Sequence, residues 1–265
     1  MSDFAADLAL AERVAREAGE LLLERFRAPA RGVEHKDSRT DMVSDADRDA
    51  EALIEQALSA ERPDDGLLAE EGAHSEARSG RRWVVDPLDG TTNYLYGLPA
   101  WAVSIALEDT EGAAVGVVHQ PVIGETFTAV RGGGARLNGA EIEVTGKERL
   151  STALVATGFA YDGAYRSVQA ELLTRVLPRV RDIRRPGAAA LDLCHVAAGR
   201  VDAYYERGLQ EWDWAAGSLM VTEAGGRLER LEGEPAGLLA STPAIAEELL
   251  TLVLGERHAQ SVHHS

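Results

Sequence analysis

The segment WVVDPLDGTTNY, residues 83–94, decides how this chain is organised. Its apolar start predicts a strand that delivers Asp86 at its end, and Asp89 follows three residues later. Gly90 permits a close backbone approach, and Thr91 opens a run suited to starting a helix or turn with exposed N–H groups. Two carboxylates and backbone donors at one strand end suit hard cations and a phosphate group. The alternative interpretation is a helix-capping turn without a ligand.

Further acidic residues favour the ligand-binding interpretation. Glu70 and Glu71 follow a short apolar run, and adjacent carboxylates at a strand end repel each other unless a cation or water lies between them. Asp213 stands between two tryptophans at the start of a predicted helix, and Asp47 lies in the first turn of another. The alternatives stay open at this point: a solvated acidic pair for the two glutamates, and helix capping for the two aspartates.

Hydrophobic periodicity predicts helices in the first part of the chain and strands after it. Apolar residues at helical spacing predict helices over 3–27 and 45–60, with Ser44 as the N-cap of the second. A polar stretch over 29–41 separates them, and residues 63–66 form a turn. The strands of a predicted antiparallel meander lie at 83–85, 102–107, 113–119, 126–130 and 142–144. The glycine-rich segment 131–135 is predicted to be a hairpin turn within this meander.

Helices and strands alternate after residue 150. Strands are predicted over 153–156, 182–184 and 201–205, and helices over 165–177, 188–198, 212–224 and 244–254. This order predicts a layered α/β fold with a sheet in each half. We expect a single domain over 1–265, with an α+β half at about 1–150 and an α/β half at about 151–255. The tail 256–265 is expected to be disordered.

Composition limits the classes of partner. The formal net charge of −17 argues against nucleic acid as a partner, because its phosphates attract Lys and Arg. An anionic substrate would need something cationic in the site, and bound metal would supply it. The N-terminus lacks the basic start and apolar core of a signal peptide, and no stretch approaches a membrane helix. We therefore expect a cytoplasmic protein without a membrane partner.

Other catalytic signatures are missing from the sequence. There is no P-loop, no HExxH zinc motif, no paired CxxC and no GxSxG serine elbow. Cys194, the one cysteine, lies in an apolar helical stretch and is expected to be a buried core thiol. Covalent catalysis by a hydroxyl or thiol therefore has little support.

The chain resembles the inositol monophosphatase family, part of the lithium-sensitive, magnesium-dependent phosphatase superfamily. WVVDPLDGTTNYLYGLPAWAVSIAL resembles the first signature of the family, and WDWAAGSLMVTEAGGRL resembles the second. Glu70-Glu71-Gly72, MVSDADRDAE, RGGGARLNGAEIEV and GAAALDLCHVAAGRVDAYYE are also similar to family segments. The resemblance covers about residues 5–255 and implies an αβαβα sandwich with mixed sheets.

The resemblance also implies a set of metal ligands. Glu70, Asp86 and the Leu88 carbonyl would hold a first Mg²⁺, and a weaker third ion would sit near Glu70. Asp86, Asp89 and Asp213 would hold a second, with Asp86 bridging the two ions. Two such ions can clamp the attacking and leaving oxygens of an in-line displacement and activate a water. Phosphoryl transfer of this kind needs positioning and charge neutralisation, and no covalent nucleophile.

The remaining implied roles concern the water and the substrate. Glu71 would orient a water molecule, and Thr91 paired with Asp47 would position and help deprotonate the attacking water. Gly90 and Thr91 would offer N–H groups to the phosphate. The implied contacts to the substrate's hydroxyl groups are made by Asp89, Ala189 and Glu206.

A few residues bear on which phosphate ester is the substrate. Thr92 and the two residues after it resemble the inositol monophosphatase branch, and Glu206 can accept two hydroxyl hydrogen bonds. Ala188 departs from the family, which often has Ser or Thr there, and this puts fine specificity in doubt. The sequence thus predicts a phosphoric monoester hydrolase that acts on inositol 1-phosphate, with some tolerance for sugar and polyol phosphates.

Three alternatives stay open. The same chemistry could act on fructose 1,6-bisphosphate or on histidinol phosphate. A regulatory role as a binding partner of the transcription machinery is an alternative of another class, because some relatives have such a second role. The family also implies a homodimer, although the sequence shows no interface.

Overall fold

The computed structural model describes residues 4–27, 32–35 and 42–255. Its helices are α1 (Ala5–Arg25), α2 (Asp45–Glu61), α3 (Thr91–Leu95), α4 (Gly163–Val176), α5 (Ala189–Ala197), α6 (Glu211–Glu223) and α7 (Ala246–Leu254). Its strands are β1 (Glu34–His35), β2 (Met42–Val43), β3 (Gly66–Ala69), β4 (His74–Ser75), β5 (Arg82–Asp89), β6 (Ala102–Asp109), β7 (Gly112–Gln120), β8 (Glu125–Val130), β9 (Gly134–Leu137), β10 (Ala140–Ile142), β11 (Leu154–Thr157), β12 (Asp182–Arg184), β13 (Ala203–Arg207), β14 (Arg227–Leu231) and β15 (Gly237–Ser241).

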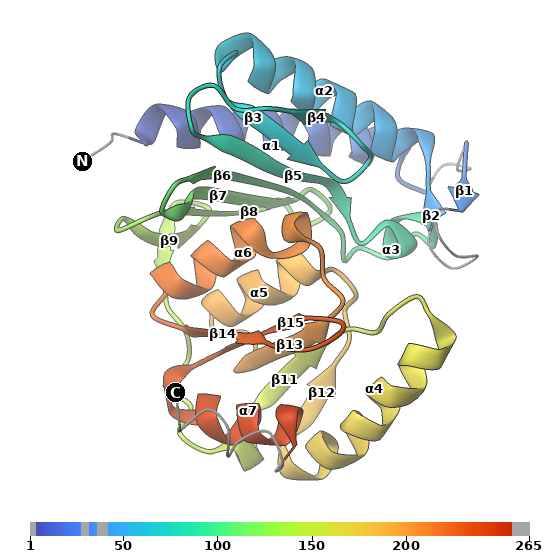
Figure 1. The fold of residues 1–265 in the computed structure, drawn as a ribbon, viewed down its shortest axis with the longest axis vertical. Helices are drawn as coiled ribbons and strands as arrows, with labels where there is room; N and C mark the ends of the chain where they lie inside the picture. The colour runs from blue at the N-terminus through green and yellow to red at the C-terminus, as the bar shows by residue number, and fades with distance from the viewer. Residues whose placement is uncertain (1–3, 28–31, 36–41, 256–265) are drawn as a thin grey trace.

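These elements stack as alternating layers of helices and sheets (Figure 1). Helices α1 and α2 cover one face of a large sheet, and α5 and α6 lie between this sheet and a smaller one. Helices α4 and α7 cover the far face of the smaller sheet. The predicted layered α/β sandwich, in the order αβαβα, is confirmed.

Both main sheets are mixed. The large sheet has the strand order β10-β9-β8-β7-β6-β5-β3-β4, in which β3 and β5 are parallel and the other pairs antiparallel. The smaller sheet has the order β12-β11-β13-β15-β14, in which β11 runs parallel to both β12 and β13. The parallel strands β11, β12 and β13 therefore end at one edge, the usual place for ligands in α/β sheets.

Three clusters of buried apolar side chains pack between the layers. One lies between α1, α2 and the large sheet, a second between the two sheets around α5 and α6, and a third under α4 and α7. The alternating side chains of β13 join two of them: Tyr204 belongs to the second cluster and Tyr205 to the third. Cys194 is buried in the second cluster, as predicted.

The helices follow the sequence prediction closely. Helix α2 begins after Ser44, which is the predicted N-cap, and the Ser44 N–H donates a 2.9 Å hydrogen bond to the Asp47 carboxylate. The predicted helix over 244–254 starts later, at Ala246, after a 3₁₀ turn that begins at Pro243. None of the helices in the described ranges is long and apolar enough to cross a bilayer.

The strand predictions are less complete. The meander β5-β6-β7-β8 is confirmed, and the turn after β8 leads into β9 as the glycine-rich segment predicted. The strand predicted over 142–144 is wrong, because β10 ends at Ile142 and the Val144 N–H donates to the Ala224 carbonyl at the end of α6. The sequence prediction missed strands β1, β2, β4, β9, β14 and β15. Of the predicted polar stretch 29–41, residues 29–31 and 36–41 lie outside the described residues, as does the tail 256–265.

An aromatic cluster fixes α3, which begins directly after the acidic end of β5. The rings of Phe26, Tyr94 and Trp101 lie with centroids 5.1–5.6 Å apart. The Tyr94 hydroxyl also donates a 2.8 Å hydrogen bond to the Leu22 carbonyl at the end of α1. Such ring pairs add about 1 kcal/mol beyond their burial. Helix α3 is therefore held rigidly against α1.

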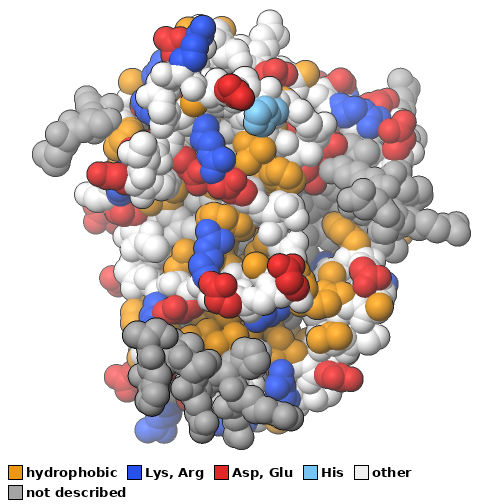
Figure 2. Space-filling model, in the orientation of Figure 1, with side chains coloured by type: hydrophobic (Ala, Val, Ile, Leu, Met, Phe, Trp, Pro, Cys, Tyr) orange, Lys and Arg blue, Asp and Glu red, His pale blue; other side chains and the backbone are white. Residues whose placement is uncertain are grey.

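Charged side chains are mixed on the visible surface. Among the described residues on the face shown in Figure 2, Lys and Arg side chains are scattered between Asp and Glu side chains. Among the described residues many Arg side chains form ion pairs, as in the network of Arg81 with Asp7 and Asp65. A scattered pattern differs from the contiguous basic surface with which proteins bind nucleic acid.

Candidate active site

The end of β5 carries two buried carboxylates on an irregular strand. Pairing with β6 joins Asp86 to Ser104 and Asp89 to Ala102, so three steps along β5 match two along β6. A bulge of this kind redirects the side chains that follow it. Asp86 and Asp89 are 2% and 6% exposed. The Leu88 N–H donates a 2.9 Å hydrogen bond to the Asp86 carboxylate, which holds the side chain in place.

Asp89 joins the two halves of the fold. Its carboxylate accepts hydrogen bonds from the N–H groups of Ala189, at 3.1 Å, and Ala190, at 2.8 Å. These are the first two residues of α5, whose orphan N–H groups favour an anion. Ala189 thus lies beside Asp89, and its N–H donates to the Asp89 carboxylate in this structure. The Ala189 contact to a substrate hydroxyl remains a prediction.

Thr91 lies between two acceptors. Its hydroxyl oxygen is 3.1 Å from the Asp47 carboxylate and 3.1 Å from the Leu88 carbonyl. A hydroxyl has one proton to donate, so it serves one acceptor at a time and keeps its lone pairs for another donor. Asp47 reaches this point from the first turn of α2, where it also accepts the hydrogen bond from Ser44. The predicted Thr91–Asp47 pair is therefore present.

Gly90 is required by the backbone at the start of α3. Its φ is +89°, in the left-handed region that favours glycine. A Cβ there would also lie 2.8 Å from the Ala100 carbonyl and 3.2 Å from the Ala188 Cβ. Ala188, the departure from the family pattern, therefore packs beside Gly90. Thr92 follows on α3 and is half-buried.

Asp213 comes from the first turn of α6. It accepts a 2.6 Å hydrogen bond from the Gln210 N–H, so it caps the helix, which is the alternative role that the sequence left open. Its pKa is nevertheless raised well above the usual range, first by burial and then by the charges of Asp89 and Glu70. Asp213 therefore both caps α6 and belongs to the group of acids that it forms with Glu70, Asp86 and Asp89, here called the acidic cluster.

Glu70 and Glu71 lie in the turn after β3. Glu70 is close enough to Asp86 to share a side-chain hydrogen bond that raises the pKa of Asp86. The turn itself is held by Glu51 on α2, whose carboxylate accepts the N–H groups of Glu71 at 2.7 Å and Ala73 at 2.9 Å. Sequence reasoning missed Glu51. Its signal was the spacing of four residues from Asp47, which puts both acids on one face of α2.

Glu206 lies at the end of β13, on the same side of the strand as Tyr204. The Tyr204 hydroxyl donates a 2.7 Å hydrogen bond to its carboxylate. Burial raises the pKa of Glu206, while the hydrogen bond from Tyr204 and the charge of Arg185 lower it. The charge of Glu206 in turn raises the pKa of Asp89 and Asp213, so this carboxylate is near the acidic cluster.

Burial and mutual repulsion disfavour the charged forms of Asp86, Asp89 and Asp213. The pKa of Asp86 is raised well above its usual range by burial and by the charges of Glu70, Asp89 and Asp213. Burial also raises the pKa of Asp89 to about 7, against the opposing hydrogen bonds from α5. The pKa of Asp47 is raised by burial as well. For these carboxylates, burial and the charges of neighbouring acids therefore outweigh the hydrogen bonds that favour the charged form.

The pH dependence of stability should reveal the raised pKa of Asp89. A carboxyl whose pKa rises from about 4 to about 7 on folding stabilises the protein below pH 4, and that contribution is lost as the pH rises through 7. We expect Asp89→Asn to gain unfolding free energy relative to the wild type between pH 4 and pH 7.5 in chelator. Urea unfolding at several pH values measures this difference, and a gap that stays constant with pH would contradict it.

The donor set of the cluster suits a hard divalent cation. The predicted ligands are carboxylates and one backbone carbonyl, and oxygen ligands of this kind are preferred by Mg²⁺. Across the described part of the chain, no group of three or more His, Cys, Asp or Glu side chains is already arranged as a metal site. The fit therefore rests on the donor chemistry and on the raised pKa values of Asp86, Asp89 and Asp213.

The structure thus gathers most of the predicted residues. Charge interactions link five of the acids, which are Glu70, Asp86, Asp89, Glu206 and Asp213. The Thr91 hydroxyl lies within hydrogen-bonding distance of both the Asp47 carboxylate and the Leu88 carbonyl. Gly90 and Ala189 border them, Glu71 lies beside Glu70, and Thr92 lies on α3.

Comparison with known proteins identifies relatives that cover most of the chain. A family profile described as the inositol monophosphatase family matches residues 5–265. Inositol-1-monophosphatase SuhB of Mycobacterium tuberculosis is 46% identical over 231 residues, which are 82% of this chain and 80% of that protein. Nus factor SuhB of Pasteurella multocida is 38% identical over 260 residues, 93% of this chain and 95% of that protein.

A solved structure agrees with these sequence matches. The extragenic suppressor protein suhB from Bartonella henselae has a TM-score of 0.89 and 39% identity to this chain. The match covers 94% of this chain and 98% of that one. The profile and the full-length relatives therefore show that the chain belongs to the inositol monophosphatase family.

Proposed function

We propose that this protein is a magnesium-dependent phosphate monoester hydrolase whose substrate is an inositol monophosphate. The observation that carries the proposal is the cluster of acids formed by the buried Asp86 and Asp89 at the end of β5 and the half-buried Asp213 at the start of α6. Asp86, Asp89 and Asp213 each have a pKa raised by burial and by neighbouring acids. Such a cluster is costly unless it binds cations, and perturbed acids gathered in one place are typical of functional sites.

The acids would hold two Mg²⁺ ions, and a third, more weakly bound ion would lie near Glu70. One ion would take Glu70, Asp86 and the Leu88 carbonyl, and the other Asp86, Asp89 and Asp213. When bound, such ions neutralise phosphate charge and lower the pKa of a water molecule. Lithium would inhibit the enzyme by occupying one of these positions.

The start of α3 would orient the phosphate and the water. The N–H groups of Gly90 and Thr91 would donate to phosphate oxygens at a helix N-terminus. The Thr91 hydroxyl would donate its proton to Asp47 while its lone pairs accept a hydrogen bond from the attacking water. Glu71 would orient a water molecule from the β3 turn.

The alcohol part of the substrate would lie toward α5 and β13. Glu206 would accept hydrogen bonds from two hydroxyl groups, and Asp89 and Thr92 would border the same space. The N–H of Ala189 would contact a hydroxyl by exchanging its present bond to Asp89. Ala188 offers no side-chain hydrogen bond there, in contrast to a Ser or Thr.

Glu206 and Gly158 provide a paired test of alcohol recognition. The Glu206 carboxylate lies 1.7–2.2 Å from the position that a Cβ at residue 158 would occupy. Both Glu206→Gln and Gly158→Ala should therefore raise KM for inositol 1-phosphate about tenfold and change kcat less. Steady-state kinetics at saturating magnesium measures this. A fall in kcat with KM unmoved in both variants would show that Glu206 does not bind the ground-state substrate.

Phosphate release tests the function as a whole. Inositol 1-phosphate, fructose 1,6-bisphosphate and histidinol phosphate are compared at equal concentration, with magnesium and with chelator. The proposal expects inositol 1-phosphate to be hydrolysed fastest, chelator to abolish the reaction and lithium to inhibit it. A different leading substrate would overturn the inositol assignment, and hydrolysis that is unaffected by chelator would overturn the metal dependence.

A regulatory role is the second candidate, because the relative from Pasteurella multocida is named a Nus factor. In that role the protein would bind a component of the transcription machinery, and phosphatase turnover would not be needed. A chromosomal deletion complemented by Asp86→Asn would favour this role, whereas complementation that requires Asp86 would favour catalysis. A homodimer is proposed from the family resemblance, and analytical ultracentrifugation measures it.

A further inference from the structure

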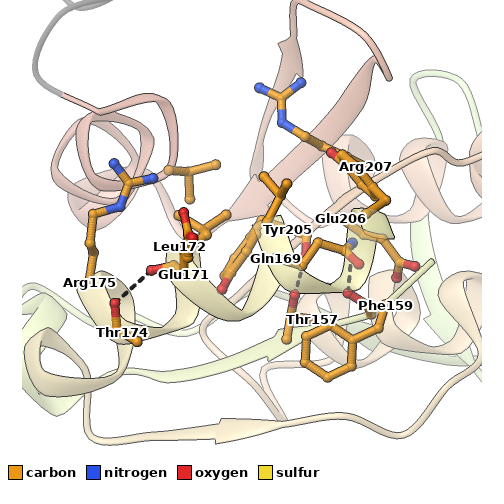
Figure 3. Close-up of a pocket in the computed structure, with 14 residues that line it drawn as sticks. Thr157, Phe159, Gln169, Glu171, Leu172, Thr174, Arg175, Tyr205, Glu206 and Arg207 are labelled. Carbon is orange, nitrogen blue, oxygen red and sulfur yellow. Dashed lines mark hydrogen bonds between the residues drawn. The ribbon is translucent and has the colours of Figure 1, made fainter. Parts of the chain in front are cut away.

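A cavity of 440 Å³ lies next to the candidate active site, at the carboxyl ends of the parallel strands β11 and β13. Its walls come from the segment after β11, the end of β13, α4 and α7. Figure 3 shows Phe159, Glu206 and Arg207 at one end of this cavity and Arg175 at the other. None of the residues predicted from the sequence except Glu206 lines it.

Glu206 and Gly158 form the wall that the cavity shares with the candidate site. Both line the cavity, and the Glu206 carboxylate occupies the space that a side chain at residue 158 would need. Phe159 follows in this wall, with its ring 5.9 Å from the Arg185 guanidinium. Arg185 also acts on the charges of Glu206 and Asp192, so this wall is close to the acidic site. A molecule bound to Glu206 therefore lies next to the cavity.

The walls suit an apolar ring. The rings of Phe159 and Tyr165 line the cavity, as does the aliphatic side chain of Val168. Val168 is 56% exposed although it is apolar, so its burial by a ligand would be favourable. Pockets for organic ligands typically combine such walls with a few polar groups.

The far end of the cavity suits an acidic group. No hydrogen bond or ion pair joins the Arg175 guanidinium to another described residue. Glu171 stands one helical turn earlier on α4, but the two side chains form no ion pair. At the other end, the Arg207 guanidinium is already engaged by the carbonyls of Glu232 and Pro235. Of the two arginines that line the cavity, Arg175 is therefore the one whose guanidinium no described residue engages.

We infer that this cavity is a subsite for the outer part of the substrate's alcohol, and that it accepts an aromatic ring with an acidic substituent. The phosphate end would stay at the acidic cluster, and the ring would pass Glu206 and lie against Phe159, Tyr165 and Val168. A carboxylate on the ring would approach Arg175. This inference rests on the proposed phosphatase function and extends its substrate class beyond compact polyol phosphates.

Binding of non-hydrolysable phosphonates tests the subsite without relying on turnover. Calorimetry compares propylphosphonate, 3-phenylpropylphosphonate and its 4-carboxyphenyl analogue on the magnesium-loaded protein. We expect the phenyl compound to bind about tenfold tighter than the propyl compound, and the carboxyphenyl compound about threefold tighter again. Equal affinities for the propyl and phenyl compounds would overturn the inference.

Two pairs of matched variants locate the effect. Val168→Trp should fill the cavity and remove the preference for the phenyl compound, while Ala170→Trp, at an exposed position of α4 that does not line the cavity, should keep it. Arg175→Gln should remove only the gain from the carboxylate, and Arg179→Gln, which loses an exposed ion pair with Glu248, should not. A preference that survives Val168→Trp would place the ring elsewhere and overturn the inference.

Kinetics with the corresponding phosphate esters separates the two proposals. The three esters are all phosphates of primary alcohols, so differences in kcat/KM should report binding of the alcohol part. If the wild type hydrolyses inositol 1-phosphate but shows no preference for the phenyl ester, the subsite fails and the phosphatase function stands. If none of these esters is hydrolysed while the phenyl phosphonate binds in a Val168-dependent way, the phosphatase function fails and the cavity remains a binding site.

Discussion

Asp86→Asn should abolish turnover and at the same time stabilise the metal-free protein. Asp86 is 2% exposed, and the charges of Glu70, Asp89 and Asp213 all oppose its ionisation. The neutral amide removes this repulsion, so unfolding free energy in chelator should rise by at least about 1 kcal/mol at pH 7.5. The same change should lower kcat by about a thousandfold or more, because it weakens a ligand shared by both proposed ions.

The measurement is urea unfolding with chelator and with magnesium, together with kcat at saturating magnesium. The wild type should gain stability from magnesium, and Asp86→Asn should gain little. Asp7→Asn is the control: Asp7 is also buried, at 5% exposed, but is paired with Arg62 and Arg81 far along the sequence from the acidic cluster. It should lose stability and keep its activity. Near-normal kcat in Asp86→Asn would rule out the bridging role.

The order of layers could be predicted because its signals are local. Helical spacing of apolar residues, the Ser44 cap and the alternation after residue 150 each depend on neighbours in the sequence. The strands that were missed carry weaker signals. Strand β14 reads Arg-Leu-Glu-Arg-Leu, in which three of the five residues are charged, although it pairs with the next strand along the chain, β15. The hairpin of β9 and β10 did have a signal, since Asn138 and Gly139 both have positive φ, as this turn type requires.

In the candidate site too, residues within one short motif could be predicted, whereas contacts between residues far apart in the sequence could not. Asp86, Asp89 and Gly90 could be found because one short motif contains them. The hydrogen bonds from α5 to Asp89 join residues about a hundred positions apart, and so could not be read from spacing. Glu51 and the cavity beside Glu206 were missed for a related reason. Glu51 binds the backbone of a turn twenty residues later, and the cavity is lined by residues from four separate elements, so neither could be recognised before the fold was known.

Thr91→Val and Asp47→Asn should each lower kcat about a hundredfold, and the double variant should be little worse than either single one. The Thr91 hydroxyl lies 3.1 Å from the Asp47 carboxylate, so the two form one proton-accepting unit. Burial raises the pKa of Asp47, which makes its carboxylate a better proton acceptor near neutral pH. Residues that act as a unit have strongly non-additive effects on kcat.

Two further variants separate this role from a structural one. Thr91→Ser keeps the hydroxyl and should retain most of kcat, whereas Thr91→Val removes it at nearly constant volume. Ser44→Ala removes the Ser44 hydroxyl that donates to the Asp47 carboxylate but keeps the Ser44 N–H that also donates to it, and so should cost about 1 kcal/mol of stability with kcat nearly unchanged. If the two single effects on kcat instead multiply in the double variant, Thr91 and Asp47 act independently. The shared proton path from the attacking water through Thr91 to Asp47 would then be wrong, and Asp47 would act on the site through α2 alone.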